Sequence, residues 1–284
     1  MSASAPFVVI VGCGRLGVWL AARLDREGCA VRIIDQDPSA LASLPENRAV
    51  CIAGDPLELE VLQRAGIEKA DIVIGVTAKD DLNVALALTC GKVFHTQRAI
   101  ARVHDPERAA SFGRYGIDTV CPTSLVASEL VPRIRGIADM KSLYVVVVGC
   151  GRLGGHLANL LSRDGHRVVV IDRDEASFSR LSAEFYSGFR VEGDASEPSV
   201  LRRAGIEKAD LMIAATHDDN VNLMVALVAH RVFGVKHAMA RVYDPDREET
   251  YRELGVETVC PTLIAGEAFF SLVYRAVEDG SARP

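Results

Sequence analysis

Short apolar runs alternate with stretches of helical periodicity along the whole chain. In the first half, the apolar runs predict strands at Phe7–Val11, Val31–Ile34, Ala49–Ile52, Ile72–Val76, Ala99–Val103 and Thr119–Cys121. The segments between them predict helices at Leu16–Arg26, Pro38–Leu44, Pro56–Ala65, Asp80–Phe94 and Glu107–Tyr115. Near-continuous apolar strands that alternate with helices are typical of a parallel sheet covered on both faces. The pattern therefore predicts an α/β fold of the doubly wound, Rossmann type.

The second half of the chain repeats the first. The sequence Gly12-Cys-Gly-Arg-Leu-Gly17 recurs as Gly149-Cys-Gly-Arg-Leu-Gly154, 137 residues further on. The sequence of Arg64–Asp71 recurs identically at Arg203–Asp210, 139 residues further on. A two-residue insertion therefore lies between the two landmarks, near 185–188. The period is far too long for a solenoid repeat, so the chain is predicted to hold two copies of one domain.

The repeat places the domains at residues 1–138 and 139–284. The first domain ends in Leu125–Met140, a helical pattern broken by Pro132 that links the copies. The apolar segment Leu263–Val277 at the end of the second domain is a candidate crossover helix. The alternative is a helix packed on the sheet of its own domain.

Composition narrows the class of protein. The chain has 284 residues, of which 49% are hydrophobic and 25% charged, and its net charge of −6 disfavours nucleic acid as a partner. No apolar stretch approaches the ~20 residues that span a bilayer, and Met1–Pro6 lacks the features of a signal peptide. The seven cysteines show no ligand spacing, which predicts no metal site and reduced, buried thiols in a cytoplasmic protein.

Each copy carries a dinucleotide fingerprint. A G-x-G-x-x-G loop follows a strand and opens a helix, and an acid ends the next strand 18 residues after the last glycine. These residues are Gly12, Gly14, Gly17 and Asp35 in the first copy, and Gly149, Gly151, Gly154 and Asp172 in the second.

The three glycines of each loop have different expected roles. The first allows a tight turn, the second lets a pyrophosphate approach, and the third lets the helix pack on the strand. The helix N-terminus offers N–H groups to phosphates, and the acid accepts hydrogen bonds from a ribose. Because a carboxylate repels a 2′-phosphate, NAD(H) or ATP/ADP is favoured and NADP is disfavoured. The alternative is a glycine loop without a ligand.

Two residues inside each loop join the candidate site. Arg15 and Arg152 can make bidentate contacts with phosphate groups, the alternative being solvated loop arginines. Leu16 and Leu153 follow them at the start of the helix and complete the candidate loop.

Candidates also follow the third and fourth strands of each copy. Asp55 and Asp194 can contact the adenine or ribose, although a helix N-cap explains them equally well. Thr77 and Thr216 begin T-x-x-D-x-x-N segments and can touch ribose or phosphate across the crevice.

The remaining polar positions of these segments have structural alternatives. Asp80 and Asp219 fit helix capping, and Asn83 and Asn222 can bond the neighbouring loop. Arg102 and Arg241 end otherwise apolar strands. Such a charge is expected to meet a phosphate, a carboxylate such as Asp80 in a structural salt bridge, or a charge of a partner subunit.

These landmarks together resemble the KTN (RCK N-terminal, TrkA-N) family of regulatory domains of potassium transporters and channels. The resemblance rests on the G-C-G-R-L-G loops, the two ribose aspartates, the L-x-x-A-G-I-E-K-A-D and T-x-x-D-x-x-N segments and the A-R-V strands. It implies a non-enzymatic, cytoplasmic gating subunit that binds NAD(H), ATP or ADP in both domains, with Arg15 and Arg152 sensing phosphate. It also implies a membrane potassium transporter or channel as partner, and a homo-oligomer (dimer or tetramer) that forms a ring of KTN domains. No C-terminal RCK domain is expected after either copy.

Two other functions remain open at this point. An NAD-dependent oxidoreductase would explain the fingerprint, but two nucleotide-binding domains occupy the whole chain. Furthermore, no local pattern places a His/Asp or Lys/Tyr pair to move a proton. A structural scaffold with a permanently bound nucleotide would also keep both loops intact.

Overall fold

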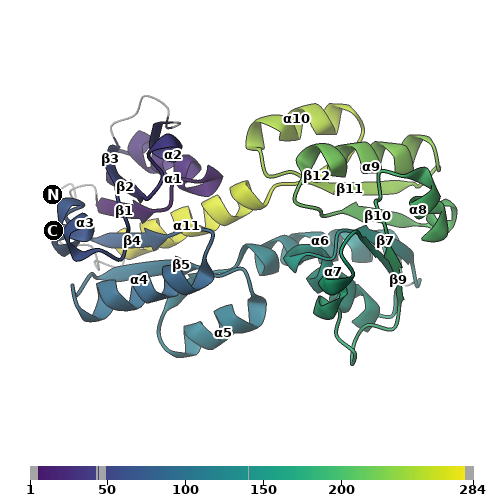
Figure 1. Cartoon of the computed structure of the whole chain (residues 1–284), viewed down its shortest axis with the longest axis horizontal. Helices are drawn as coiled ribbons and strands as arrows, with labels where there is room; N and C mark the ends of the chain where they lie inside the picture. The colour runs from purple at the N-terminus through teal and green to yellow at the C-terminus, as the bar shows by residue number, and fades with distance from the viewer. Residues whose placement is uncertain (1–5, 43, 45–48, 140, 279–284) are drawn as a thin grey trace. The chain divides into compact units, whose positions relative to one another are not determined.

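The structure is a computed structural model that describes residues 6–42, 44, 49–139 and 141–278. Residues 276–278 are described by their backbone alone. The chain divides into two compact units, Met1–Pro122 with Thr262–Pro284, and Thr123–Pro261 (Figure 1). Within the described residues, each unit is built on one six-stranded sheet whose paired strands are all parallel. The predicted fold class, two tandem Rossmann-type doubly wound domains, is therefore confirmed.

The first unit has the strand order β3-β2-β1-β4-β5-β6. Its strands are β1 (Phe7–Val11), β2 (Ala30–Asp35), β3 (Val50–Ala53), β4 (Ile72–Gly75), β5 (Arg98–Arg102) and β6 (Asp118–Val120). Its helices are α1 (Arg15–Arg26), α2 (Pro38–Ala42), α3 (Leu59–Arg64), η1 (Ile67–Lys69), α4 (Asp80–Lys92), α5 (Pro106–Arg114) and, from Thr262 on, α11 (Pro261–Glu278).

The second unit has the matching order β12-β11-β10-β7-β8-β9. Its strands are β7 (Tyr144–Val148), β8 (Arg167–Asp172), β9 (Phe189–Glu192), β10 (Leu211–Ala214), β11 (His237–Arg241) and β12 (Glu257–Val259). Its helices are α6 (Pro122–Ala138), α7 (Arg152–Arg163), η2 (Glu175–Arg180), α8 (Pro198–Arg203), η3 (Ile206–Lys208), α9 (Asp219–Arg231) and α10 (Pro245–Glu253).

The helix after β3 begins later than the sequence predicts. The expected helix Pro56–Ala65 is α3, which begins at Leu59 with Glu58 as its N-cap. The Asp55 carboxylate instead accepts the N–H of Leu57 at 2.9 Å and closes a turn before the helix. The prediction that Asp55 caps this helix is therefore wrong. The predicted helix Pro38–Leu44 ends at Ala42, and residue 43 lies outside the described residues.

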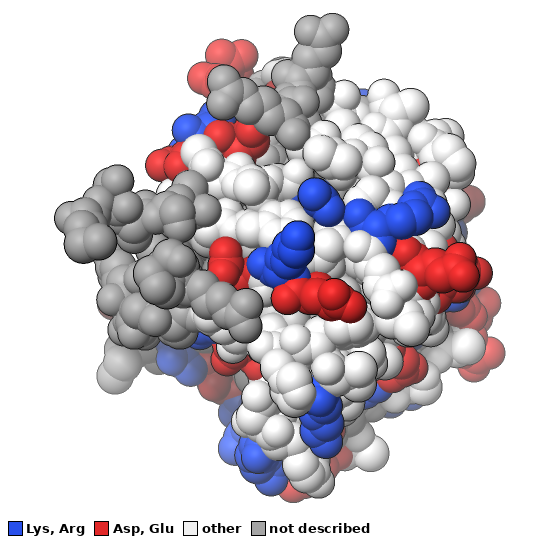
Figure 2. Space-filling model, turned by 90° about the vertical axis from the view of Figure 1, so that its left-hand side faces the viewer, with Lys and Arg blue, Asp and Glu red and all other residues white. Residues whose placement is uncertain are grey.

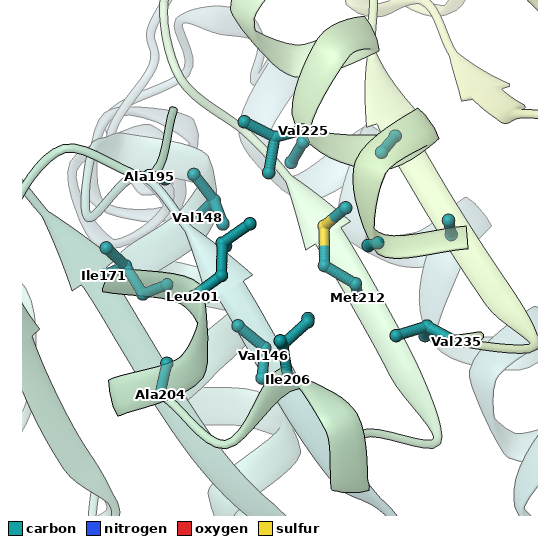
Figure 3. Close-up of a cluster of buried hydrophobic side chains, with 14 of the residues drawn as sticks. Val146, Val148, Ile171, Ala195, Leu201, Ala204, Ile206, Met212, Val225 and Val235 are labelled. Atoms are coloured by element: carbon teal, nitrogen blue, oxygen red, sulfur yellow. The ribbon is translucent and has the colours of Figure 1, made fainter. Parts of the chain in front are cut away.

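The central strands form the core of each unit. In the second unit, Val146 and Val148 of β7 pack with Ile171 of β8, Met212 of β10 and Leu201 of α8, each at most 2% exposed (Figure 3). Burial of such aliphatic side chains is the main stabilising contribution to folding, so these contacts stabilise the sheet. The loops at its carboxyl edge are thereby held in place.

The structure also shows the state of the cysteines and the distribution of the surface charges. All seven cysteines are free thiols and six are buried, but Cys51 on the edge strand β3 is exposed, contrary to expectation. On the face of the molecule in Figure 2, the described basic and acidic side chains are interspersed. No described helix is both long enough and apolar enough to cross a membrane.

Helix α11 packs on the first copy of the repeat. The ring of Trp19 in α1 lies against Gly266, and the Arg23 guanidinium lies 4.7 Å from the centre of the Phe270 ring. Arg98 of β5 also donates to the carbonyl of Leu272 at 3.2 Å. The helix that follows the second copy is thus part of the first compact unit, whereas the repeat places Leu263–Val277 in the domain 139–284.

The contact between Trp19 and Gly266 can be tested by adding one methyl group. A Cβ at residue 266 would lie 2.5 Å from two Trp19 ring atoms, so Gly266→Ala forces α11 away from α1. We expect a loss of about 1–3 kcal/mol in the free energy of unfolding, as is usual for overpacking. Urea denaturation followed by the fluorescence of Trp19, the only tryptophan, measures it.

Gly136→Ala in α6 is the matched control, because a Cβ there meets nothing within 4 Å. It should leave stability unchanged or raise it by up to about 1 kcal/mol through helix propensity. Equal destabilisation by the two substitutions would contradict the packing described for α11.

Candidate functional site

The glycine loops lie at the carboxyl edge of each sheet, where the strand order reverses. The first loop follows β1, which lies between β2 and β4, and the second follows β7, between β8 and β10. Open α/β sheets bind their ligands in the crevice at this switch point. The predicted loops therefore occupy the expected place in both units.

The first and third glycines of each loop are required by the fold itself. Gly12 has φ +111°, and a Cβ there would lie 2.9 Å from the backbone nitrogen of Thr77. A Cβ at Gly17 would overlap the carbonyl oxygen of Gly12, and Gly154 meets Gly149 in the same way. Neither contact can be relieved by a rotamer change, because the atoms that would be struck are backbone.

The second glycine is different, because no protein atom restricts it. A Cβ at Gly14 or Gly151 would meet nothing within 4 Å, and both residues have negative φ. The fold therefore tolerates a side chain at these positions. The missing side chain at these positions therefore serves no packing contact within the protein. It leaves the backbone open to the approach of a ligand.

The helix N-termini at these loops have no side-chain caps. Helices α1 and α7 begin at Arg15 and Arg152, after Gly14 and Gly151 as N-caps without a capping hydrogen bond. Their first-turn N–H groups and the dipole favour an anion. Both arginines are exposed, and Arg152 forms no hydrogen bond or ion pair with any described residue.

Two predicted residues of the loop contribute only through their backbone. The side chains of Leu16 and Leu153 are 5% and 4% exposed and point into the core. They anchor the first turn of the helix beneath the loop. Only their N–H groups can face a ligand.

The two ribose aspartates tie the end of the second strand to the glycine loop. Asp35 Oδ2 accepts the N–H of Cys13 at 2.6 Å, and its Oδ1 accepts the N–H of Asp37 at 2.9 Å. Asp172 makes the same bonds with Cys150 at 2.6 Å and Asp174 at 3.0 Å. Each carboxylate oxygen has a further lone pair for a ribose hydroxyl. The loop is thus positioned by the residue expected to recognise the sugar.

The aspartates after the third strand of each copy close turns. Asp194 Oδ1 accepts the N–H of Ser196 at 2.8 Å, as Asp55 does with Leu57. Asp194 also forms an ion pair with Arg173 at 2.8 Å, whereas the first copy has Gln36 in place of that arginine. Hydrogen bonds from Ser196 and then the charge of Arg173 lower the pKa of Asp194. Its carboxylate therefore stays ionised at neutral pH.

Asn83 and Asn222 organise the far side of the crevice. Asn83 is fully buried, and its Oδ1 accepts the N–H and the hydroxyl of Thr77 at 2.9 and 2.8 Å. Its Nδ2 donates to the carbonyls of Thr77 and Arg102 at 2.9 and 3.0 Å. Asn222 makes the equivalent four bonds. The expectation that these asparagines bond the neighbouring loop is confirmed.

The strand-end arginines lie beside this network. Arg102 donates to the carbonyl of Thr77 at 2.7 Å, and Arg241 donates to that of Thr216. Arg241 is only 8% exposed, its guanidinium lies 4.5 Å from the centre of the Tyr243 ring, and burial lowers its pKa. It has no ion pair within 4.0 Å of a described residue, although the negative charge of Asp219 acts on it and opposes the effect of burial on its pKa. A buried guanidinium of this kind favours an anion nearby.

Asp80 and Asp219 do not cap their helices. Helices α4 and α9 begin at these residues, after Lys79 and Asp218 as N-caps. Asp80 instead accepts the N–H of His104 at 2.9 Å, and Asp219 accepts that of Tyr243 at 3.0 Å. Each joins the start of its helix to the loop after the next strand. The capping prediction is wrong because the carboxylates reach a segment that is remote in sequence.

The structure also brings together a His/Asp pair that the sequence did not reveal. His104 Nδ1 lies 2.8 Å from Asp80 Oδ1, and both side chains are largely buried. The second copy has Tyr243 in place of His104, so the pair occurs in the first copy alone. Only the histidine in A-R-V-H-D-P could have signalled it. No cluster of possible metal ligands occurs among the described residues.

The chain is similar to known potassium uptake proteins. A TrkA protein of the Trk potassium uptake system of Streptomyces coelicolor is 47% identical over 117 residues, which cover 41% of this chain and 52% of that protein. The chain thus matches about half of that relative's length. A TrkA homologue of Methanosarcina mazei is 21% identical over 88% of this chain and 84% of its own length.

Solved structures show the same fold. The structure of GsuK bound to ADP has a TM-score of 0.79 at 22% identity and covers 95% of this chain and 70% of its own. The GsuK channel bound to NAD has a TM-score of 0.80 at 16% identity and covers 99% of this chain and 65% of its own.

The TrkA-N domain model matches residues 8–123 and again residues 145–262. These ranges contain both glycine loops, both ribose aspartates and both T-x-x-D-x-x-N segments, and they cover most of the chain. The chain therefore belongs to the TrkA-N domain family and carries two tandem copies of that domain.

Proposed function

We propose that this chain is a nucleotide-sensing regulatory subunit of a membrane potassium transporter or channel. One observation carries the proposal: in both units, an uncapped helix N-terminus, an unobstructed second glycine and a ribose aspartate meet at the sheet's switch point. Relatives named as Trk potassium uptake proteins support the link to potassium. The subunit acts in the cytoplasm, at the inner face of the membrane through its partner, and forms a homo-oligomeric ring of such domains.

Each unit binds NAD(H) or ATP/ADP in the same orientation. The phosphates lie at the N-terminus of α1 or α7, within reach of Arg15 or Arg152. The adenosine ribose bonds Asp35 or Asp172, and the adenine lies towards Asp55 or Asp194. The terminal phosphates or second nucleoside extend towards the threonine and arginine of the far side, Thr77 and Arg102 or Thr216 and Arg241. The ribose aspartates disfavour a 2′-phosphate.

Regulation requires that a nucleotide bind two states of the subunit with different affinities. In the first unit, α1 carries the phosphate-binding N-terminus and also holds α11 through Trp19 and Gly266. A shift of α1 caused by a change of bound phosphates would therefore also displace α11, the helix that follows the second copy. This arrangement favours a sensor over an enzyme or a static scaffold.

The glycines separate folding from binding. Gly14→Ala adds a methyl group that meets no protein atom, so stability should stay within about 1 kcal/mol of wild type. The same methyl group blocks the approach of phosphates, and ADP affinity at the first site should fall by about tenfold or more, roughly one lost charge-assisted contact. Gly17→Ala should lower stability by about 2 kcal/mol or more through its clash with Gly12. Calorimetric titration and thermal unfolding measure the two effects, and ADP binding unchanged by Gly14→Ala would contradict this site.

The role in potassium uptake can be tested in cells of the organism that encodes this chain, after deletion of the gene for the chain. The wild-type chain should restore uptake of radioactive rubidium, and the folded double variant Gly14→Ala/Gly151→Ala should not. Full restoration by the double variant would refute nucleotide sensing. No effect of the wild-type chain on uptake would refute the link to potassium, and substrate-dependent oxidation of NADH would instead identify an oxidoreductase.

A further inference from the structure

The two glycine-loop sites differ in charge where the adenosine ribose would lie. The second copy has three arginines around this position: Arg173, Arg180 and Arg190. By the offsets of the repeat, the first copy has Gln36, Ser43 and Cys51 in their places. The aspartates Asp35, Asp37 and Asp55 recur as Asp172, Asp174 and Asp194, and the second copy adds Glu175 and Glu192 where the first has Pro38 and Ala53. The second ribose site therefore carries three arginines that the first lacks, and the two added glutamates offset only part of their charge.

Arg173 spans the edge of the ribose site. It directly follows Asp172 at the end of β8, and its Nη2 lies 2.8 Å from Oδ2 of Asp194, just after β9. Its side chain is 63% exposed. A guanidinium carries five N–H donors, and this ion pair occupies only one nitrogen. The remaining donors can bind a phosphate on the ribose.

Arg180 and Arg190 are held nearby by their backbones. The carbonyl of Arg180 accepts Nδ2 of Asn159 at 3.0 Å, which fixes the end of η2 on α7. Arg190 pairs in register with Val170, two residues before Asp172 on β8. Both residues are exposed, and neither guanidinium forms a hydrogen bond or ion pair with another described residue. Two arginine side chains are thus free to meet an anion beside the ribose aspartate.

The charges that act on the cysteine thiols of the two glycine loops differ in the same way. Burial, together with a smaller contribution from the neighbouring aspartate, raises the pKa of Cys13 and of Cys150 to about 11. At Cys150 the positive charges of Arg180 and Arg190 oppose this effect, whereas no arginine does so at Cys13. Since the N–H of Cys150 bonds Asp172 at 2.6 Å, both arginines act on the immediate surroundings of that carboxylate.

We propose that the second site accepts an adenine dinucleotide with a 2′-phosphate on its adenosine ribose, of the NADP(H) type, and that the first site does not. This inference rests on the proposed function, in which both units bind adenine nucleotides. Asp172 alone would repel the phosphate, but both of its oxygens accept backbone N–H groups, Arg173 follows it in the chain, and the charges of Arg180 and Arg190 act on Cys150, which bonds it. Arginine suits this role because its planar fork matches phosphate oxygens. The first copy has no arginine at the three matching positions.

The test is a calorimetric titration of the full chain with NAD and with NADP. NAD should bind at two sites per chain and NADP at one. The double variant Arg173→Gln/Arg190→Gln should weaken NADP binding by about tenfold or more, the equivalent of one lost charge-assisted hydrogen bond. Binding of NAD should change by less than about threefold, because the contacts of the unphosphorylated ribose remain.

Two controls separate the local effect from a change in net charge. Arg114→Gln on α5 removes one positive charge from the first unit, which does not contain the second copy's loops, and should change neither affinity. Gly151→Ala should weaken NADP binding by about tenfold or more, as Gly14→Ala does for ADP at the first site, which assigns the NADP site to the second unit. Thermal unfolding confirms that each variant is folded.

The outcomes distinguish this inference from the proposed function. Two NAD sites with no NADP site would overturn the inference and leave the proposed function standing. NADP binding that survives the double arginine variant would also overturn it. If neither dinucleotide binds, and ADP and ATP do not bind either, the proposed function fails and this inference fails with it.

Discussion

In each unit, the contact between the third glycine of the loop and the carbonyl of the first fixes where the helix begins. A Cβ at Gly17 or Gly154 would overlap that carbonyl oxygen, so only glycine lets α1 and α7 start so close to β1 and β7. This close start points the uncapped N–H groups of the helix at the crevice. In the same loops, the N–H groups of Cys13 and Cys150 lie 2.6 Å from one oxygen of Asp35 and of Asp172, at the ends of β2 and β8. The position of the phosphates thus depends on a single backbone contact in a loop that also bonds the ribose aspartate.

The far wall of the crevice depends on a buried asparagine. Asn83 and Asn222 each make four hydrogen bonds that join the end of the fourth strand of the copy to the end of the fifth. A buried polar network specifies one arrangement when all its members are satisfied. The same network recurs in both units, whereas the surrounding charges differ between them. The two copies therefore share one scaffold and have diverged where a ligand would touch it.

Much of the fold and the loop geometry could be predicted from the sequence, because strand periodicity and glycine spacing are local signals. The ribose aspartates follow from their fixed distance to the glycines. The roles of Asp80 and Asp219 could not be predicted, since their partners lie 24 residues away in the loop after the next strand. The sequence could not distinguish the turn at Asp55 from a helix cap, because Asx turns and helix caps use the same residue types. The missed His104–Asp80 pair likewise forms only when the sheet aligns two strand ends.

The central claim is that each unit holds one adenine nucleotide at its glycine loop. Calorimetric titration of nucleotide-stripped protein with NAD, NADH, ATP and ADP tests it most directly, together with Asp35→Asn and Asp172→Asn. These substitutions keep one carbonyl acceptor for the loop but remove the charge that recognises the ribose. The account predicts two classes of site, each lost with its own aspartate. It also predicts that a site binds NAD and NADH, or ATP and ADP, with unequal affinity. No binding of any of the four nucleotides, or binding indifferent to both substitutions, would contradict it.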